Sequence, residues 1–208
     1  MPSPRRIDVH HHPAPPTYLA ARRQDPNWNP AEGGWTVERS LTDMDEGGVA
    51  TAVLSLPHAV NIWPADRAQG RRYAREWNDF MAGLGRDHPG RFGLFAALPV
   101  LDIEGSLAET EYVFDTLHAD GVTLMTNIGD RWLGDPHYWP IFEELNRRKA
   151  VVYTHPVAPN CCAGILPELA DATIEFGTDT TRAIAKLVFS GAAARFPDIR
   201  FKIGRAHV

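Results

Sequence analysis

The sequence is poor in cysteine and has no long apolar run. Its 208 residues include two cysteines, Cys161 and Cys162, which are neighbours. Adjacent cysteines close almost no loop and so add little stability as a disulfide. We therefore predict free thiols and a cytoplasmic location. No stretch approaches the roughly 18 consecutive apolar residues of a membrane span, and residues 1–6 precede no apolar segment of the kind that a secretory signal needs.

An excess of positive charge is also missing. The 21 Lys and Arg residues are outnumbered by 26 Asp and Glu residues, which leaves a formal net charge of −5. The basic residues form no long stripe, so neither nucleic acid nor a membrane is expected as a partner. Hydrophobic residues make up 44% and charged residues 23% of the chain. That balance is typical of a globular protein, and the length suits one α/β domain.

Short runs rich in Val, Leu and Ala alternate with segments of helical spacing along the whole chain. A run of Pro, Asn and Gly at residues 18–35 predicts a long loop. The predicted strands are the segment that leads into residues 10–12, then 49–56, 92–100, 122–127, 150–154 and 199–203. The predicted helices are 40–46, 67–86, 102–117, a segment that begins at residue 135, and 178–189. Residues 178 and 179 are predicted to cap the last of these helices.

This alternation predicts a parallel sheet covered by helices. Two architectures are possible, an open doubly wound sheet and a (β/α)8 barrel. The first strand lacks the Gly-rich phosphate turn of dinucleotide-binding folds, and histidines stand in its place. In a barrel the functional residues gather at the carboxyl ends of the strands, which is where His10, His12 and His155 fall. We therefore predict the barrel.

Three consecutive histidines end the first predicted strand. Because side chains alternate along a strand, His10 and His12 point to one side and His11 to the other, with about 6–7 Å between the first two along the backbone. His155 ends the strand at 150–154 and offers a third imidazole. Three imidazoles with open positions favour a Lewis-acidic divalent ion, Zn²⁺ or another. A polar loop of histidines and a core histidine at position 155 are the structural alternatives.

Other residues follow strand ends as well. Trp63 lies after the second strand and Asn127 after the fourth, and both are predicted to contact a substrate. A packed aromatic ring and a turn residue are the alternatives. Cys161 and Cys162 follow His155 closely, and thiolates are good zinc ligands, so either could approach the ion.

The motif Asp8-Val9-His10-His11-His12-Pro13 resembles the start of the amidohydrolase superfamily, in the branch called amidohydrolase 2. Further matching segments lie at residues 48–56, 89–99, 133–136, 144–148, 152–156, 180–184 and 195–201. The most similar branch members are 6-methylsalicylate and aminocarboxymuconate-semialdehyde decarboxylases. The resemblance implies a distorted barrel, a divalent ion (usually zinc) held by His10, His12 and His155, and loss of CO2 from a small carboxylate.

The same resemblance implies two residues that have no match in this sequence. The family has an acid/base histidine in a His-x-Gly-Gly context after strand six and a metal-binding aspartate after strand eight. After Lys202 this chain reads IGRAHV, in which His207 is displaced and lacks the glycines. We therefore expect residues 1–202 to form about six of eight barrel strands and residues 203–208 to be a non-native tail. Weak metal retention and little turnover are expected unless subunits complete one another.

Three functional hypotheses follow from these observations. The first is a metal-dependent, non-oxidative decarboxylase of a small aromatic acid such as 6-methylsalicylate. The alternative is a metal-dependent hydrolase of an amide or a lactone, since metal-activated water also attacks carbonyl carbons. The third is a barrel without catalysis that binds a metal or a partner. A homo-oligomer is possible under all three.

Overall fold

Six parallel strands form one curved sheet in which the spatial order follows the order in the sequence. The computed structural model describes residues 6–24, 33–56, 66–129 and 131–204. The sheet order is β1-β2-β3-β4-β7-β8. The strands are β1 Arg6–His11, β2 Val49–Leu54, β3 Phe92–Ala97, β4 Gly121–Met125, β7 Val151–His155 and β8 Arg200–Ile203. A doubly wound sheet reverses its strand order at a switch point, whereas this sheet adds every strand on the same side. The barrel-type architecture, with six strands present, is confirmed.

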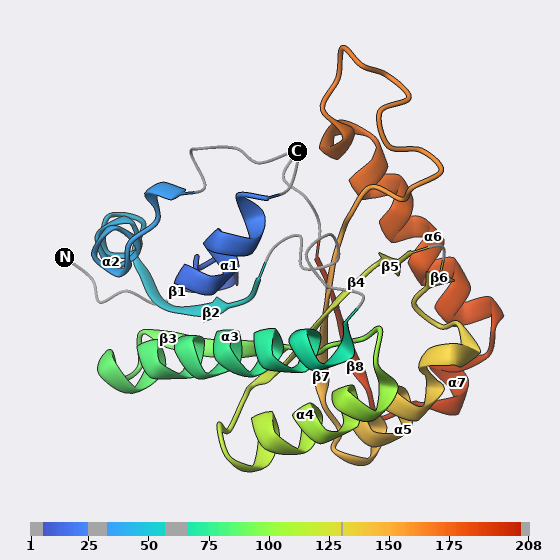
Figure 1. Ribbon diagram of the computed structural model, residues 1–208, viewed down its shortest axis with the longest axis horizontal. Helices are drawn as coiled ribbons and strands as arrows, with labels where there is room; N and C mark the ends of the chain where they lie inside the picture. Colours follow the sequence, from blue (N-terminus) through green and yellow to red (C-terminus); the bar gives the residue numbers. More distant parts are fainter. Residues whose placement is uncertain (1–5, 25–32, 57–65, 130, 205–208) are drawn as a thin grey trace.

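The helices lie around the outside of the curved sheet (Figure 1). They are α1 Pro16–Arg22, α2 Val37–Glu46, α3 Arg67–Asp87, α4 Ile103–Asp115, α5 Trp139–Arg147, α6 Glu175–Phe189 and α7 Ala192–Arg195. Short 3-10 turns lie at Pro136–Tyr138 (η2) and Asp171–Thr173 (η3), and β5 Asn127–Ile128 pairs with β6 Arg131–Trp132 in a small hairpin. No helix in the described ranges has the length and apolarity that a membrane crossing requires.

Two predicted elements differ from the structure. Residues 18–35 were predicted as a loop, but α1 occupies part of that segment. Pro16 stands in the first turn of α1, where proline costs no intrahelical hydrogen bond, and Tyr18 is buried with its ring 5.8 Å from that of Trp77. The sixth helix begins at Glu175, so Thr178 and Asp179 lie inside it and do not cap it. Both errors arose because buried contacts overrode local signals.

The two faces of the sheet carry different side chains. Helix-facing residues of the strands join one large apolar core with the inner sides of the helices. On the concave face, Val53, Phe95 and Tyr153 form a separate buried cluster with Val9 and Val151. The strand register accounts for this division, because residues paired across parallel strands point to the same face. The concave face is therefore the interior of the barrel-type sheet.

An irregularity in β1 decides where its histidines point. Asp8 pairs with Ala52 and His11 pairs with Leu54, so β1 has one residue more than β2 between these pairs. Such a bulge re-aims side chains. Asp8 and His11 are hydrogen-bonded to each other (3.3 Å), and His11 Nε2 lies 2.9 Å from the Ser40 hydroxyl of α2. His11 thus faces the helices, as the alternation along the strand predicts.

The last described residues continue the sheet. Ile203 ends β8, and the backbone N–H of Gly204 donates to the carbonyl of Thr154 at 2.9 Å. His207 lies outside the described residues.

Candidate metal centre

His10, His12 and His155 meet at the carboxyl ends of β1 and β7. One ring nitrogen from each lies within 4.8 Å of those from the other two. The ring centroids are 4.6 Å apart for His10 and His12, 5.2 Å for His10 and His155, and 5.0 Å for His12 and His155. His155 is 4% exposed, and the other two are partly buried. The sequence-based prediction that these three imidazoles converge is confirmed.

Backbone carbonyls orient two of the three rings. Nδ1 of His12 lies 2.8 Å from the carbonyl oxygen of Ser55, and Nδ1 of His155 lies 2.9 Å from that of Pro156. A carbonyl oxygen only accepts, so each Nδ1 carries a proton and each Nε2 presents a lone pair. In metal-binding histidines, a hydrogen bond donated by one ring nitrogen typically fixes the tautomer and the orientation of the ring, so that the other nitrogen can bind the metal.

The spacing of these lone pairs fits a metal ion. The two Nε2 atoms of His12 and His155 are 3.3 Å apart. A tetrahedral ion with bonds of about 2.0–2.1 Å holds two ligand nitrogens about 3.3–3.4 Å apart. Two lone pairs that face each other at this distance repel unless a cation lies between them. The donor set therefore fits a divalent ion.

Tyr153 and Lys202 form the floor beneath the histidines. The Tyr153 ring lies 5.5 Å from that of His10 and stacks on Phe95 at 5.5 Å. Burial raises the pKa of Tyr153 above its usual value, and its hydroxyl has no hydrogen-bond partner in the described part of the chain. Lys202 Nζ lies 4.2 Å from the Tyr153 ring centroid and donates to the carbonyl of Val9 at 3.3 Å. Burial lowers the pKa of Lys202.

Sequence reasoning missed both floor residues. The signal was available for Tyr153, because it stands two positions before His155 on the same strand and therefore shares its face. Lys202 could not be found in this way, because its contact with Val9 joins β8 to β1 across 193 positions of sequence.

A buried carboxylate ties the loops beside His155 together. Asp179 on α6 is fully buried and accepts hydrogen bonds from the Thr126 hydroxyl (2.5 Å), the Asn127 amide (2.6 Å) and the Trp132 indole (2.5 Å). The backbone N–H of Thr126 donates to the carbonyl of His155 at 2.9 Å. Asp179 therefore holds the segment after β4 against His155 at the end of β7.

The remaining candidates stand as follows. Asn127 is 3% exposed and its amide donates to Asp179, and its contact with a substrate stays a prediction. Trp63 lies outside the described residues. Within the described ranges, the three histidines are the only group of at least three His, Cys, Asp or Glu side chains that could hold a metal ion, and neither Cys161 nor Cys162 belongs to it.

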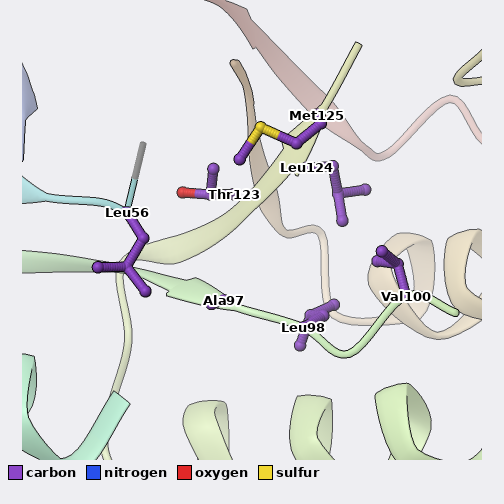
Figure 2. Close-up of a pocket in the computed structure, with 7 residues that line it drawn as sticks. All are labelled: Leu56, Ala97, Leu98, Val100, Thr123, Leu124 and Met125. Carbon is purple, nitrogen blue, oxygen red and sulfur yellow. The ribbon is translucent and has the colours of Figure 1, made fainter. Parts of the chain in front are cut away.

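An apolar hollow lies at the carboxyl ends of β2, β3 and β4. Figure 2 shows its lining, with Leu56, Thr123 and Met125 along one side, and the space measures about 270 Å³ including its open mouth. Among the described lining residues, Thr123 is the one with a polar side chain, and it donates its hydroxyl to the carbonyl of Phe95 at 3.3 Å. Met125 pairs with His155 in the strand register, so the hollow begins one strand away from the metal centre. The other lining residues are Ala97, Leu98, Val100 and Leu124.

Comparison with known proteins agrees with this site. Residues 7–204 match the amidohydrolase family Amidohydro_2. This chain belongs to that amidohydrolase family. The matched range includes all three clustered histidines and every strand of the large sheet except the first residue of β1.

Several curated relatives are named as decarboxylases. Decarboxylase yanB of Aspergillus niger is 40% identical over 94% of this chain and 56% of its own length. Decarboxylase macB of Penicillium terrestre is 37% identical over 94% of this chain and 61% of its own length. The 6-methylsalicylic acid decarboxylase acuB of Aspergillus aculeatus is 34% identical over 89% of this chain and 58% of its own length. The chain thus spans about three fifths of the length of these amidohydrolase relatives.

Solved structures show the same fold. The 5-carboxyvanillate decarboxylase LigW from Sphingomonas paucimobilis superposes with a TM-score of 0.83 at 25% identity, covering 97% of this chain and 68% of its own. A dihydroxybenzoic acid decarboxylase from Polaromonas sp. JS666 has a TM-score of 0.80 at 27% identity, and the match covers 95% of this chain and 64% of that chain. Its structure was solved with bound manganese and the inhibitor 2-nitroresorcinol. A divalent metal at the histidine cluster therefore agrees with both the geometry and a related structure.

Proposed function

We propose that this amidohydrolase is a metal-dependent, non-oxidative decarboxylase of a small aromatic acid such as 6-methylsalicylate. The observation that carries the proposal is the convergence of His10, His12 and His155 at the carboxyl ends of the strands, beside an apolar hollow. The relatives named as decarboxylases support it, and one of them, 34% identical, is named for 6-methylsalicylic acid.

The proposed metal is Zn²⁺ or Mn²⁺. Three neutral imidazole nitrogens suit zinc, and the manganese in the Polaromonas structure supports the second ion. A bound ion would supply Lewis acidity toward a carboxylate or phenolate oxygen. The chain's own contribution is to hold the two Nε2 lone pairs of His12 and His155 in place through the carbonyls of Ser55 and Pro156.

The hollow has an apolar lining. Its walls are aliphatic apart from Thr123, whose hydroxyl already donates to Phe95. A substrate would place its apolar ring against the mouth of the hollow and direct its carboxylate toward the histidines one strand away. Such a site stabilises an aromatic acid through burial of the ring.

The proposal concerns the complete barrel. The acid/base histidine and the metal-binding aspartate that the family resemblance implies have no match in this sequence. We therefore propose that residues 1–202 are part of a larger barrel domain, that residues 203–208 are a non-native tail, and that turnover requires the missing parts. A cytoplasmic location is part of the proposal and is supported by the free thiols of Cys161 and Cys162.

The test separates metal binding from turnover. First, the 208-residue chain is titrated with Mn²⁺ and with Zn²⁺. One ion per chain is expected, and at least about a hundredfold weaker binding in His155→Ala because one of three ligands is lost. Arg39→Ala, which changes an exposed residue of α2 outside the cluster, is the control. Unchanged metal affinity in His155→Ala would refute the site.

Second, the product of the complete reading frame at this locus is incubated with 6-methylsalicylate and with aryl lactones. Release of CO2 from the acid supports decarboxylation. Ring opening of the lactone without CO2 release would overturn it in favour of the hydrolase. Metal binding with neither reaction would also overturn it and leave a binding protein.

A further inference from the structure

The two cysteines form a close pair outside the metal centre. Cys161 is exposed, Cys162 is half-buried, and both are free thiols. Their Sγ atoms lie 2.8 Å apart, although neighbouring residues in an extended chain point to opposite sides. A tight turn causes this, because the backbone N–H groups of Cys162 and Ala163 both donate to the carbonyl of Pro159, at 2.9 and 3.0 Å. The fold thus presents a dithiol with both sulfurs on one side.

The dithiol stands at the edge of a second hollow. This hollow measures about 310 Å³ including its open side. It lies in the arm between β7 and α6, which projects beyond the end of the sheet in Figure 1. Most of its lining is aliphatic and unusually exposed, with Ile165 at 61% and Leu169 at 44%. The lining residues are Cys162, Ile165, Leu166, Leu169, Ala170, Asp171, Ile174 and Glu175.

We propose that Cys161 and Cys162 form a bidentate site for a trivalent arsenical that carries an aryl group, with the aryl group in the adjoining hollow. Thiolate sulfur is the ligand that soft, thiophilic centres prefer. Two sulfurs on one side can both bond to one arsenic atom, which makes the second bond intramolecular and raises the affinity well above that of a single thiol.

The reaction balances without an oxidant. An arylarsine oxide, Ar–As=O, reacts with two S–H groups to form two As–S bonds and one molecule of water. Arsenic stays trivalent, and the two thiol protons leave with the oxygen. The hydrogen bond with Cys161 raises the pKa of the Cys162 thiol.

Neighbouring charge holds Cys162 in position. The Arg182 guanidinium lies 3.8 Å from Cys162 Sγ and 3.3 Å from the Glu175 carboxylate. This contact from α6 orients the Cys162 sulfur. The site uses none of the three metal-binding histidines, so it stands independently of the proposed decarboxylase activity.

The experiment uses the purified chain and phenylarsine oxide, followed by intact-protein mass spectrometry and thiol counting. One adduct per chain and a fall from two free thiols to none are expected. An excess of a dithiol, 2,3-dimercaptopropanol, should remove the adduct, whereas the same concentration of 2-mercaptoethanol should not. Cys161→Ser and Cys162→Ser should each bind at least about a hundredfold more weakly. Equal binding by either single variant, or two adducts per chain, would overturn the proposal.

A second comparison tests the hollow. Phenylarsine oxide should bind about tenfold more tightly than a methylarsenical, because the ring buries apolar surface. Leu169→Asn should remove that preference and leave methylarsenical binding unchanged. Ile184→Asn, at an equally exposed position of α6 outside the hollow, is the matched control. A preference that survives Leu169→Asn would contradict the placement of the aryl group.

Discussion

The two faces of the six-stranded sheet do different work. The outer face packs against helices through a large apolar core, in which Phe142, Leu145 and Val152 are completely buried. The inner face has a small apolar cluster and then a tyrosine, a lysine and three histidines. Since burial of apolar surface is the main stabilising contribution, the outer face supplies stability, and the inner face can carry polar groups that function requires.

The largest effect is expected from the outer face. Phe142 is fully buried, with ring centroids 5.8 Å from Phe196 and 5.9 Å from Phe201. Phe142→Ala should lower the free energy of unfolding by about 3–5 kcal/mol through lost burial and a cavity. Urea unfolding measures this. Affinity for Mn²⁺ per folded molecule should stay within about twofold of the wild type, and a large loss would show that the two faces are not separable.

Asp179 connects the helical layer to the inner site and should affect both. Asp179→Asn keeps the shape but loses charge-assisted hydrogen bonds and turns an amide N–H₂ toward donors. We expect a loss of about 2 kcal/mol in the free energy of unfolding and a decrease of about tenfold in Mn²⁺ affinity, because the loops beside His155 loosen. Asp66→Asn is the control, because Asp66 caps the start of α3 and asparagine is an equally good helix cap. Unchanged affinity in Asp179→Asn would limit its role to stability.

Ion pairs on the outer layer predict a modest pH dependence. Hydrogen bonds from Arg147 and then Arg148 lower the pKa of Glu144 from 4.5 to about 2. A lowered pKa in the folded state means that this stabilisation is complete above pH 4.5 and is lost as the pH falls toward 2. The contribution should not exceed about 1 kcal/mol, because the pairs are partly solvated. Urea unfolding at pH 5 and pH 2.5 should show a larger fall for the wild type than for Glu144→Gln. Equal falls would contradict the assignment.

The smallest effect is expected at the floor of the inner site. Tyr153→Phe removes a buried hydroxyl that has no partner in the described part of the chain. The free energy of unfolding should stay within about 0.5 kcal/mol of the wild type or rise, because no hydrogen bond is lost and a desolvated polar group is removed. A loss above about 1 kcal/mol, measured by urea unfolding, would show that the hydroxyl is hydrogen-bonded.

Local patterns predicted most of the elements. Asp102 and Asp135 cap helical segments through their side chains, close to where the sequence places the helix starts. The strands are recognisable because buried parallel strands are nearly continuous apolar runs. The loop prediction at residues 18–35 was wrong for the part that α1 occupies, because the buried contacts of Tyr18 outweigh the local Pro, Asn and Gly signals.

The sequence alone determined that histidines stand at the ends of two buried strands, because strand periodicity and apolar runs are local properties. It also determined which of the three consecutive histidines share a face. Only the tertiary structure decided that β1 contains a bulge and that Lys202 reaches Val9 across the sheet. It also decided that Asp179, a residue of α6, accepts three hydrogen bonds from side chains outside that helix. The hydrogen bonds of Lys202 and Asp179 join residues that are between 47 and 193 positions apart, and no local pattern records which distant groups a fold brings together.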